Sequence, residues 1–135
     1  VLGYHSLLQS KGLPFDSNEA GEINKEVFAL MQARSHAASA EMAKELGEPE
    51  ILKGYGRRHT TTMAVAPTTS SAFILGQVSQ GIEPIWSNCY IKDVAKMKVV
   101  IKNPLLEELL EEKGLNDKTT WDSIRDADGS VQHPD

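Results

Sequence analysis

The sequence has very little cysteine, and Cys89 is the only one in its 135 residues. A single thiol cannot form an internal disulfide, a CxxC redox pair or a cysteine-rich zinc site, so these classes are excluded. The chain also lacks any run close to the roughly 20 apolar residues that a membrane-spanning helix needs. Low cysteine content is typical of a reducing compartment, so we expect an intracellular, cytoplasmic protein. No base or redox partner neighbours Cys89, and we expect its thiol to be buried and inert.

Positive charge is also scarce. The chain has 14 Lys and Arg against 19 Asp and Glu, which gives a net charge of −5. Nucleic acids and anionic membranes are bound by basic surfaces, so this balance argues against both partners. The rest of the composition, 40% hydrophobic and 24% charged, is ordinary for a globular protein. The length suits one domain.

Neither end of the sequence reads like the end of a domain. The first residues are mostly apolar, without an initiator Met, and no basic stretch leads into an apolar one, so the pattern is not that of a signal peptide. Residues 129–135 read like the approach to a further element. We therefore expect residues 1–135 to form a single partial domain that is an internal piece of a longer protein.

The spacing of apolar residues predicts several helices. Asp16 stands three residues before Glu19, which resembles a capping box at the start of a long amphipathic helix. Asn103 is suited to cap another helix, with Pro104 at its first position. The predicted helices cover about residues 2–11, 17–46 and 104–113, and a last one starts near residue 119.

Two strands are expected in addition, at residues 60–66 and 97–101. The first is β-branched and then apolar, and the second alternates. Pro67 ends the first strand, and a hydroxyl-rich turn then leads into a short apolar helix before Gly76. Residues 77–90 read as irregular. The expected fold class is α/β, predominantly helical with a few strands.

The hydroxyl-rich turn, Thr68-Thr69-Ser70-Ser71, is the strongest candidate site. A strand that feeds a helix N-terminus through such a turn gathers unpaired backbone N–H groups and the positive end of the helix dipole, a suitable place for an anion. Arg57 and Arg58 precede the strand and could neutralise a phosphate if the chain folds back. The alternative is that the hydroxyls only cap the helix and the arginines are solvated. The spacing is not that of a Walker loop.

Other residues give weaker signals. The four histidines show no HxxxH or HExxH spacing and do not predict a metal site. Glu83 lies between Gly81 and Pro84, as either a buried structural carboxylate or a site residue. The helix at 104–113 carries an acidic face that we expect to be solvated, made of Glu107, Glu108, Glu111 and Glu112.

Two stretches resemble the catalytic (large, alpha) subunit of ribonucleotide reductase. They are Ala-Val-Ala-Pro-Thr-Thr-Ser-Ser at 64–71 and Val-Ser-Gln-Gly-Ile-Glu-Pro at 78–84. Residues 2–12 and 129–133 are also similar to family stretches, in the same order. The resemblance implies an internal fragment from the C-terminal half of the family's ten-stranded α/β barrel.

The resemblance also implies an activity and a site. The family is an oxidoreductase of deoxyribonucleotide biosynthesis for DNA replication, which reduces ribonucleotides to deoxyribonucleotides by a radical mechanism. Its proline-plus-hydroxyl loop binds the substrate's phosphates through backbone amides and side chains. Arg58 matches a family arginine, although His59 stands where Asn is common. The substrate-phosphate-binding role is carried over to Thr68, Thr69, Ser70 and Ser71, and a site-shaping role to Pro67, Gly81, Glu83 and Pro84.

The family's radical-bearing cysteine, reducing cysteine pair and catalytic Asn and Glu lie before this stretch. Its radical-relay tyrosines and C-terminal cysteines lie after it, and Cys89 matches none of them. We therefore expect no catalytic residue, metal or cofactor in this chain, and no activity from the chain alone. The parent enzyme would need a radical source, either a metal-radical partner subunit or adenosylcobalamin. Expected partners are a nucleotide substrate, the remaining large-subunit segments, a radical-generating small subunit and, through orphaned strands, a second copy.

A second hypothesis is a non-catalytic helical binding or self-association module derived from a truncated reductase gene. The sequence leaves open whether the chain is a split-gene product, a truncated frame or a remnant. It also leaves open whether the substrate is a diphosphate or a triphosphate. Restored nucleotide reduction on mixing with the missing segments would favour the enzyme, and a self-associating domain without nucleotide affinity would favour the module.

Overall fold

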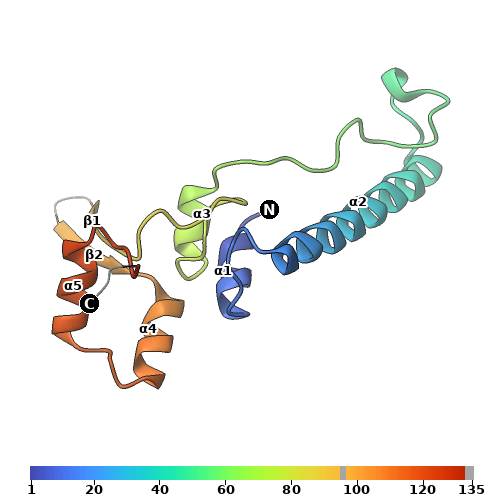
Figure 1. Ribbon diagram of the computed structural model, residues 1–135. Coiled ribbons are helices and arrows are strands. Elements are labelled where there is room, and N and C mark those ends of the chain that lie inside the picture. Colours follow the sequence, from blue (N-terminus) through green and yellow to red (C-terminus); the bar gives the residue numbers. More distant parts are fainter. Residues whose placement is uncertain (95–96, 133–135) are drawn as a thin grey trace. The chain divides into compact units, whose positions relative to one another are not determined.

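A computed structural model describes residues 1–94 and 97–132 of the chain (Figure 1). By internal packing the chain divides into two compact units. The first holds Leu13–Ala66 together with Val1, and the second holds Leu2–Gly12 and the chain from Pro67 onward. That residues 1–135 form a single partial domain stays a prediction.

The first unit is dominated by one long helix, α2 (Asn18–Leu46), as the apolar spacing predicted. The residue that caps it is Ser17, whose Oγ accepts a hydrogen bond from the backbone N–H of Ala20 at 3.1 Å. The predicted capping box of Asp16 and Glu19 is therefore wrong by one residue, because Ser17 has the extended backbone of an N-cap. Gly47, at a φ of 78°, ends the helix.

After α2 the chain returns alongside it, held by hydrogen bonds to hydroxyls on the helix. The buried Oγ of Ser39 accepts from the N–H of Arg58 at 3.1 Å and from that of His59 at 3.0 Å. Further along, the hydroxyl of Ser35 donates to that of Thr62 at 2.9 Å. These contacts fix the return segment in register with the small-residue half of the helix.

The connection at the far end of α2 contains a short 3₁₀ helix, η1 (Glu50–Leu52). The carboxylate of Glu48 closes the loop around it, because its two oxygens accept from the N–H groups of Gly54 and Gly56, each at 2.5 Å. Leu52 is buried under the loop.

The predicted strand at residues 60–66 is not formed. These residues belong to no helix or strand, and among residues 1–94 and 97–132 nothing pairs with them. The physical reason is that a strand exists only through hydrogen bonds to a neighbouring strand. A β-branched composition favours that conformation but cannot supply the partner.

The second unit contains the remaining elements. They are α1 (Tyr4–Ser10), α3 (Thr69–Ile74), β1 (Cys89–Val94), β2 (Met97–Lys102), α4 (Pro104–Glu112) and α5 (Lys118–Asp126). The two strands form an antiparallel hairpin in which Cys89 pairs with Lys102 and Ile91 with Val100. The strand β2 and the four helices were predicted. The strand β1 was not predicted: Cys89 and Tyr90 lie in the segment 77–90 that was expected to be irregular, and the rest of the strand follows that segment.

The core of this unit lies where the hairpin, α4 and α5 come together, at the orange-to-red end of the chain in Figure 1. Its buried side chains are those of Cys89, Leu110, Trp121 and Ile124, with Leu106 packed against them. Cys89 is only 6% exposed, so the prediction of a buried thiol is confirmed.

Both core helices begin at polar caps. The Oδ1 of Asn103 accepts from the N–H of Leu105 at 3.2 Å with Pro104 following the cap, as predicted. For α5, the carboxylate of Asp117 accepts from the N–H of Thr120 at 2.8 Å. The acidic face of α4 is mostly exposed, as expected.

A glycine ties the end of α5 to the start of β1. Gly129 has a φ of 83°, and its carbonyl accepts from both the backbone and the side-chain N–H of Asn88, at 3.1 and 2.9 Å. A Cβ at this position would lie 1.9 Å from the Oγ of Ser87, so no larger residue fits without movement. The family-like stretch 129–133 begins at this contact, and its residue 133 lies outside the described residues.

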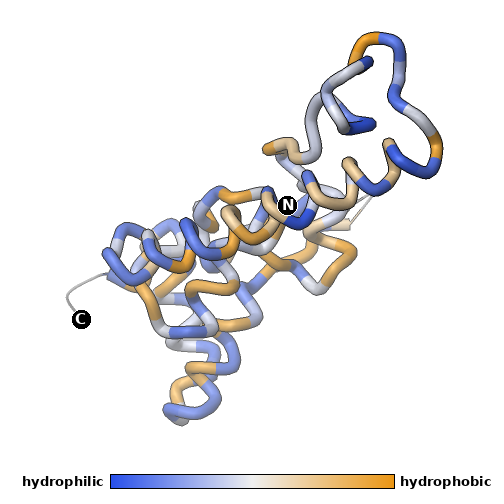
Figure 2. Tube along the Cα trace, turned by 90° about the vertical axis from the view of Figure 1, so that its right-hand side faces the viewer, coloured by the Kyte–Doolittle hydropathy of each residue, from blue (hydrophilic) through white to orange (hydrophobic). Residues whose placement is uncertain are grey.

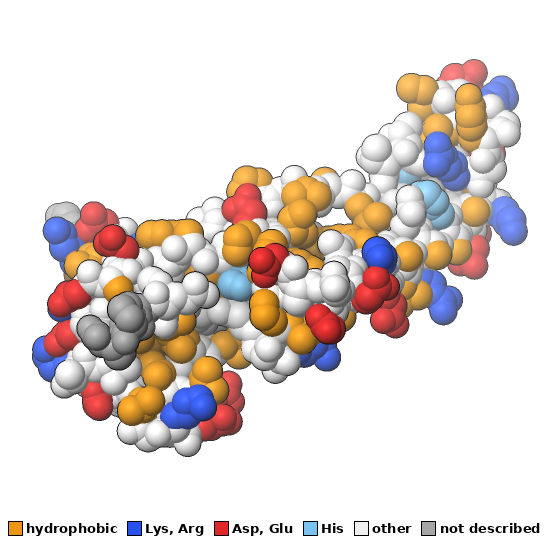
Figure 3. Space-filling view, viewed as in Figure 1, with side chains coloured by type: hydrophobic (Ala, Val, Ile, Leu, Met, Phe, Trp, Pro, Cys, Tyr) orange, Lys and Arg blue, Asp and Glu red, His pale blue; other side chains and the backbone are white. Residues whose placement is uncertain are grey.

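Polar and apolar residues are interleaved along the chain (Figure 2), and none of the described helices is long and apolar enough to cross a membrane. On the face drawn in Figure 3, acidic and basic side chains are interspersed. This distribution matches the modest negative charge of the sequence.

Candidate functional site

The predicted anion-binding turn begins with an unusual backbone conformation. Pro67 is exposed, and Thr68 follows at a φ of 51°, in the left-handed region, as the N-cap of α3. A β-branched residue in this region costs on the order of 1–2 kcal/mol and persists only where surrounding contacts hold it. One such contact is the N–H of Gly81, which donates to the Oγ1 of Thr68 at 2.9 Å.

The next three residues present hydroxyl groups at the surface. Thr69, Ser70 and Ser71 are all exposed, and the hydroxyl of Thr69 donates to the Oε1 of Gln80 at 2.9 Å. Within residues 1–94 and 97–132, the hydroxyls of Ser70 and Ser71 have no hydrogen-bond partner. Because α3 has only six residues, its dipole is small, so these hydroxyls and the first-turn amides are the main donors.

The predicted site-shaping turn lies beside this segment. Gly81 is buried at a φ of 51°, and the N–H of Glu83 donates to the carbonyl of Gln80 at 3.0 Å. Glu83 and Pro84 are exposed, so the alternative of a buried structural carboxylate at Glu83 is wrong. The turn therefore contacts the hydroxyl-rich segment through two side-chain hydrogen bonds, at Thr68 and at Thr69.

Arg58 has a structural partner in the first unit. Its Nη1 donates to the carbonyls of Leu46 and Gly47 at 3.1 and 2.7 Å, which satisfies orphan acceptors at the end of α2. The sequence left open whether Arg57 and Arg58 neutralise an anion or are solvated. For Arg58 the structure shows a third role, that of a helix C-terminal cap.

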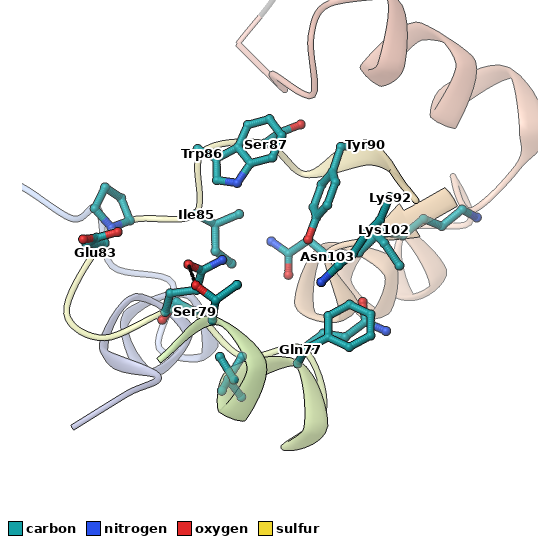
Figure 4. A pocket seen from close by; sticks show the side chains of 17 residues that line it. Gln77, Ser79, Glu83, Ile85, Trp86, Ser87, Tyr90, Lys92, Lys102 and Asn103 are labelled. Carbon is teal, nitrogen blue, oxygen red and sulfur yellow. Dashed lines mark hydrogen bonds between the residues drawn. The ribbon is translucent and has the colours of Figure 1, made fainter. Parts of the chain in front are cut away.

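A cavity of about 80 Å³ opens between the loop after α3 and the hairpin (Figure 4). Tyr90 and Lys92 point into it from β1, and Glu83 lies at its rim. The Nζ of Lys92 lies 4.0 Å from the centre of the Phe73 ring, and the rings of Trp86 and Tyr90 lie 4.8 Å apart. The wall is thus partly aromatic, and it also includes two lysines, Lys92 and Lys102.

Two polar groups of the cavity, those of Tyr90 and Gln77, were not foreseen. Burial raises the pKa of the Tyr90 hydroxyl, which stays a neutral donor near pH 7. Among the described residues, the buried Oε1 of Gln77 has no hydrogen-bond partner. Sequence reasoning missed Tyr90 because it did not predict β1, which brings this residue to the cavity, and no motif pointed to Gln77. Of the predicted site residues, Thr69, Glu83 and Pro84 line the cavity.

His5, in α1, contacts the loop that leads from the site-shaping turn to β1. Its Nδ1 accepts a hydrogen bond from the N–H of Ile85 at 2.8 Å, so this nitrogen carries no proton. Burial lowers the pKa of His5, which favours the neutral ring. Within the described residues, no group of three His, Cys, Asp or Glu side chains is placed to hold a metal ion.

Known proteins share both the sequence and the fold of this chain. The sequence matches the family described as "Ribonucleotide reductase, barrel domain" over residues 1–54 and 49–135. The ribonucleoside-diphosphate reductase large subunit of Invertebrate iridescent virus 6 is 37% identical over 98% of this chain and 14% of its own length. The vitamin B12-dependent ribonucleoside-diphosphate reductase of Thermoplasma acidophilum is 32% identical over 85% of this chain and 16% of its own length.

A solved structure also resembles this chain in sequence and fold. The class Id ribonucleotide reductase alpha subunit of Actinobacillus ureae is 53% identical and superposes with a TM-score of 0.88, over 98% of this chain and 24% of that one. The chain thus spans a quarter or less of each of these relatives. The predicted resemblance, and the predicted fold as a segment of the reductase barrel, are confirmed. The chain belongs to the ribonucleotide reductase barrel-domain family.

Proposed function

We propose that this chain is the part of a ribonucleoside-diphosphate reductase large subunit that holds the phosphates of the substrate. The single observation that carries the proposal is the exposed run of hydroxyls and first-turn amides after the left-handed Thr68. Family membership supports it, since the matching loop of the family binds substrate phosphates.

The chemistry suits a small phosphorylated ligand. Each hydroxyl and each amide N–H can donate one hydrogen bond to a phosphate oxygen without adding a positive charge. Such a site recognises an anion by directed donors, so it needs no basic field. This is consistent with a chain whose net charge is −5.

The complete enzyme would reduce ribonucleotides to deoxyribonucleotides by a radical mechanism, as an oxidoreductase of deoxyribonucleotide biosynthesis in the cytoplasm. The names of the relatives favour diphosphate substrates. Both radical sources stay compatible with the family, because one of these relatives is named as vitamin B12-dependent. The catalytic cysteines, the small subunit and the radical source belong to the parent enzyme, and this chain contributes binding and orientation of the substrate.

The test uses a large subunit reconstituted from this chain and the remaining segments. Replacing Ser70 and Ser71 with Ala removes two phosphate donors, so we expect the dissociation constant of a nucleoside diphosphate to rise by about tenfold or more. Calorimetry measures this constant, and it also measures that of the unphosphorylated nucleoside, which is expected to stay the same.

Ser123→Ala is the matched control, because it removes an exposed hydroxyl from α5, away from the loop. Unchanged diphosphate affinity in the Ser70→Ala, Ser71→Ala variant would rule out the phosphate-binding role. Self-association of the chain without any nucleotide affinity would favour the non-catalytic module instead.

A further inference from the structure

The first turn of α1 is held by a residue far away in the sequence. Its N-cap, Gly3, has no side chain to accept from the first-turn amides. The Oγ of Ser79 fills this role by accepting from the N–H of Ser6 at 3.1 Å. In return, the N–H of Ser79 donates to the Oγ of Ser6 at 2.9 Å, and the carbonyl of Ser79 accepts from the N–H of Gly3 at 2.8 Å. The two serines thus form a reciprocal pair.

This reciprocal pair is shielded from water. Ser79 is 2% exposed and is among the most deeply buried side chains of the described chain. A buried donor or acceptor that loses its partner cannot recover the hydrogen bond from solvent. The pair is therefore a strong local constraint on the position of the loop that carries Ser79.

The same loop holds the phosphate-binding segment. Two residues after Ser79, the N–H of Gly81 donates to the Oγ1 of Thr68, the residue in the left-handed conformation. One residue after Ser79, the side chain of Gln80 accepts from the hydroxyl of Thr69. A chain of direct hydrogen bonds therefore runs from α1 through residues 79–81 to the start of α3.

A second contact holds the other end of this loop. The Nδ1 of His5 accepts from the N–H of Ile85 at 2.8 Å. Adjacent residues of α1, His5 and Ser6, thus fix both ends of the segment 79–85, which lies against the cavity in Figure 4. None of the phosphate-binding residues belongs to α1 itself.

We propose that Ser6 and Ser79 are positioning residues for the phosphate-binding loop, so that α1 sets the affinity of the site for phosphorylated substrates without touching them. This proposal rests on the proposed function above. When the reciprocal pair is broken, Gly81 shifts, Thr68 loses the contact that holds its left-handed backbone, and the donors at 69–71 no longer converge on one anion.

The experiment uses the reconstituted large subunit with Ser79→Ala and, separately, Ser6→Ala. We expect the dissociation constant of a nucleoside diphosphate to rise by about threefold to tenfold in each, the effect of one lost hydrogen bond. The dissociation constant of the unphosphorylated nucleoside is expected to stay unchanged. Ser6→Thr, which keeps the hydroxyl, should restore the affinity for the diphosphate.

The matched control is Ser10→Ala. Ser10 belongs to the same helix, but its hydroxyl donates only to the carbonyl of Leu7, at 2.9 Å, and does not reach the loop. Its diphosphate affinity should equal that of the unchanged protein. Because Ser6 is less buried than Ser79, Ser6→Ala carries the test if Ser79→Ala does not fold.

Three outcomes would overturn the proposal. Equal weakening of the diphosphate and of the nucleoside would show general destabilisation instead of positioning. Unchanged diphosphate affinity in both variants, together with weakened binding on replacing Ser70 and Ser71, would reject the positioning role and leave the proposed function standing. Unchanged affinity in all of these variants would reject both.

Discussion

The two units of the chain are stabilised in different ways. In the first unit, the 29-residue α2 buries only Ala20, Ser39 and Ala43. Three of its large apolar side chains are exposed, Leu30 at 56%, Met42 at 37% and Leu46 at 62%. Hydrogen bonds to hydroxyls, to the Glu48 carboxylate and from the capping guanidinium of Arg58 connect the segments of this unit.

The second unit has an apolar core instead. Two nine-residue helices, α4 and α5, bring Leu110, Trp121 and Ile124 against Cys89 of the hairpin. Burial of this kind contributes roughly 1.5–3 kcal/mol for each large side chain. The comparison teaches that helix length says little about the source of stability, since the shorter helices bury the larger residues.

The largest expected effect is the loss of the core of the second unit. Trp121 is 6% exposed, and its Nε1 donates to the Oδ1 of Asn116 at 2.7 Å. We expect Trp121→Ala to lower the free energy of unfolding by about 3–5 kcal/mol, because it leaves a cavity and an unpaired amide. Urea denaturation followed by circular dichroism measures this change, and amide exchange in β1 locates it.

Leu30→Ala in α2 is the matched truncation in the first unit. Because Leu30 is 56% exposed, we expect a change within about 0.5 kcal/mol. If Leu30→Ala lowered the free energy of unfolding as much as Trp121→Ala, the contrast between the units would be wrong. The exposed face of α2 would then be covered by another surface under the conditions of the measurement.

The sequence predicted best what is determined locally. The helices α1, α2, α4 and α5 were all foreseen, because apolar spacing lies within each segment, even though the residue that caps α1 is the distant Ser79. The cap of α2 was misplaced by one residue, since Asp16 and Ser17 are both good caps and only the backbone conformation distinguishes them.

The non-local features were the ones that failed. The segment 60–66 has strand composition but no pairing partner among the described residues, and β1 becomes a strand only through β2. The candidate site shows the same division. The hydroxyl run at 68–71 was visible as a motif, whereas the pairing of Ser6 with Ser79 joins residues 73 positions apart.

An intermediate effect is expected from the buried hydroxyl of the first unit. Ser39 is 2% exposed, and its Oγ accepts from the N–H groups of Arg58 and His59. Ser39→Ala removes this acceptor from both donors, although the N–H of Arg58 keeps the carbonyl of Ser39 as a partner at 3.2 Å, so we expect a loss of about 1–3 kcal/mol. Amide exchange at residues 58–62 reports it as faster exchange.

Ser35→Ala is the milder counterpart, because its hydroxyl reaches only the side chain of Thr62 in the return segment, and its other partner is the carbonyl of Gln32 in α2 itself. We expect its effect to be smaller than that of Ser39→Ala. Slow exchange at residues 58–62 in Ser39→Ala would show that the return segment is held by contacts other than the hydroxyl of Ser39.

The smallest effect concerns the periphery of the second unit, where α1 is attached by polar contacts like those of the first. His5 accepts from the N–H of Ile85 only while its Nδ1 is unprotonated, and burial lowers the pKa of His5 below its ordinary value of 6.5. The unfolded chain therefore binds the proton first, so the contribution of His5 is complete above pH 6.5 and declines as the pH falls towards the lowered pKa. We expect the urea midpoint to fall between pH 7.5 and 5.5 by more in the unchanged protein than in His5→Asn, whose Oδ1 can accept the same hydrogen bond without titrating. Equal pH dependence in the two proteins would show that α1 is attached independently of the His5 ring, and would leave the serine pair as its main polar anchor.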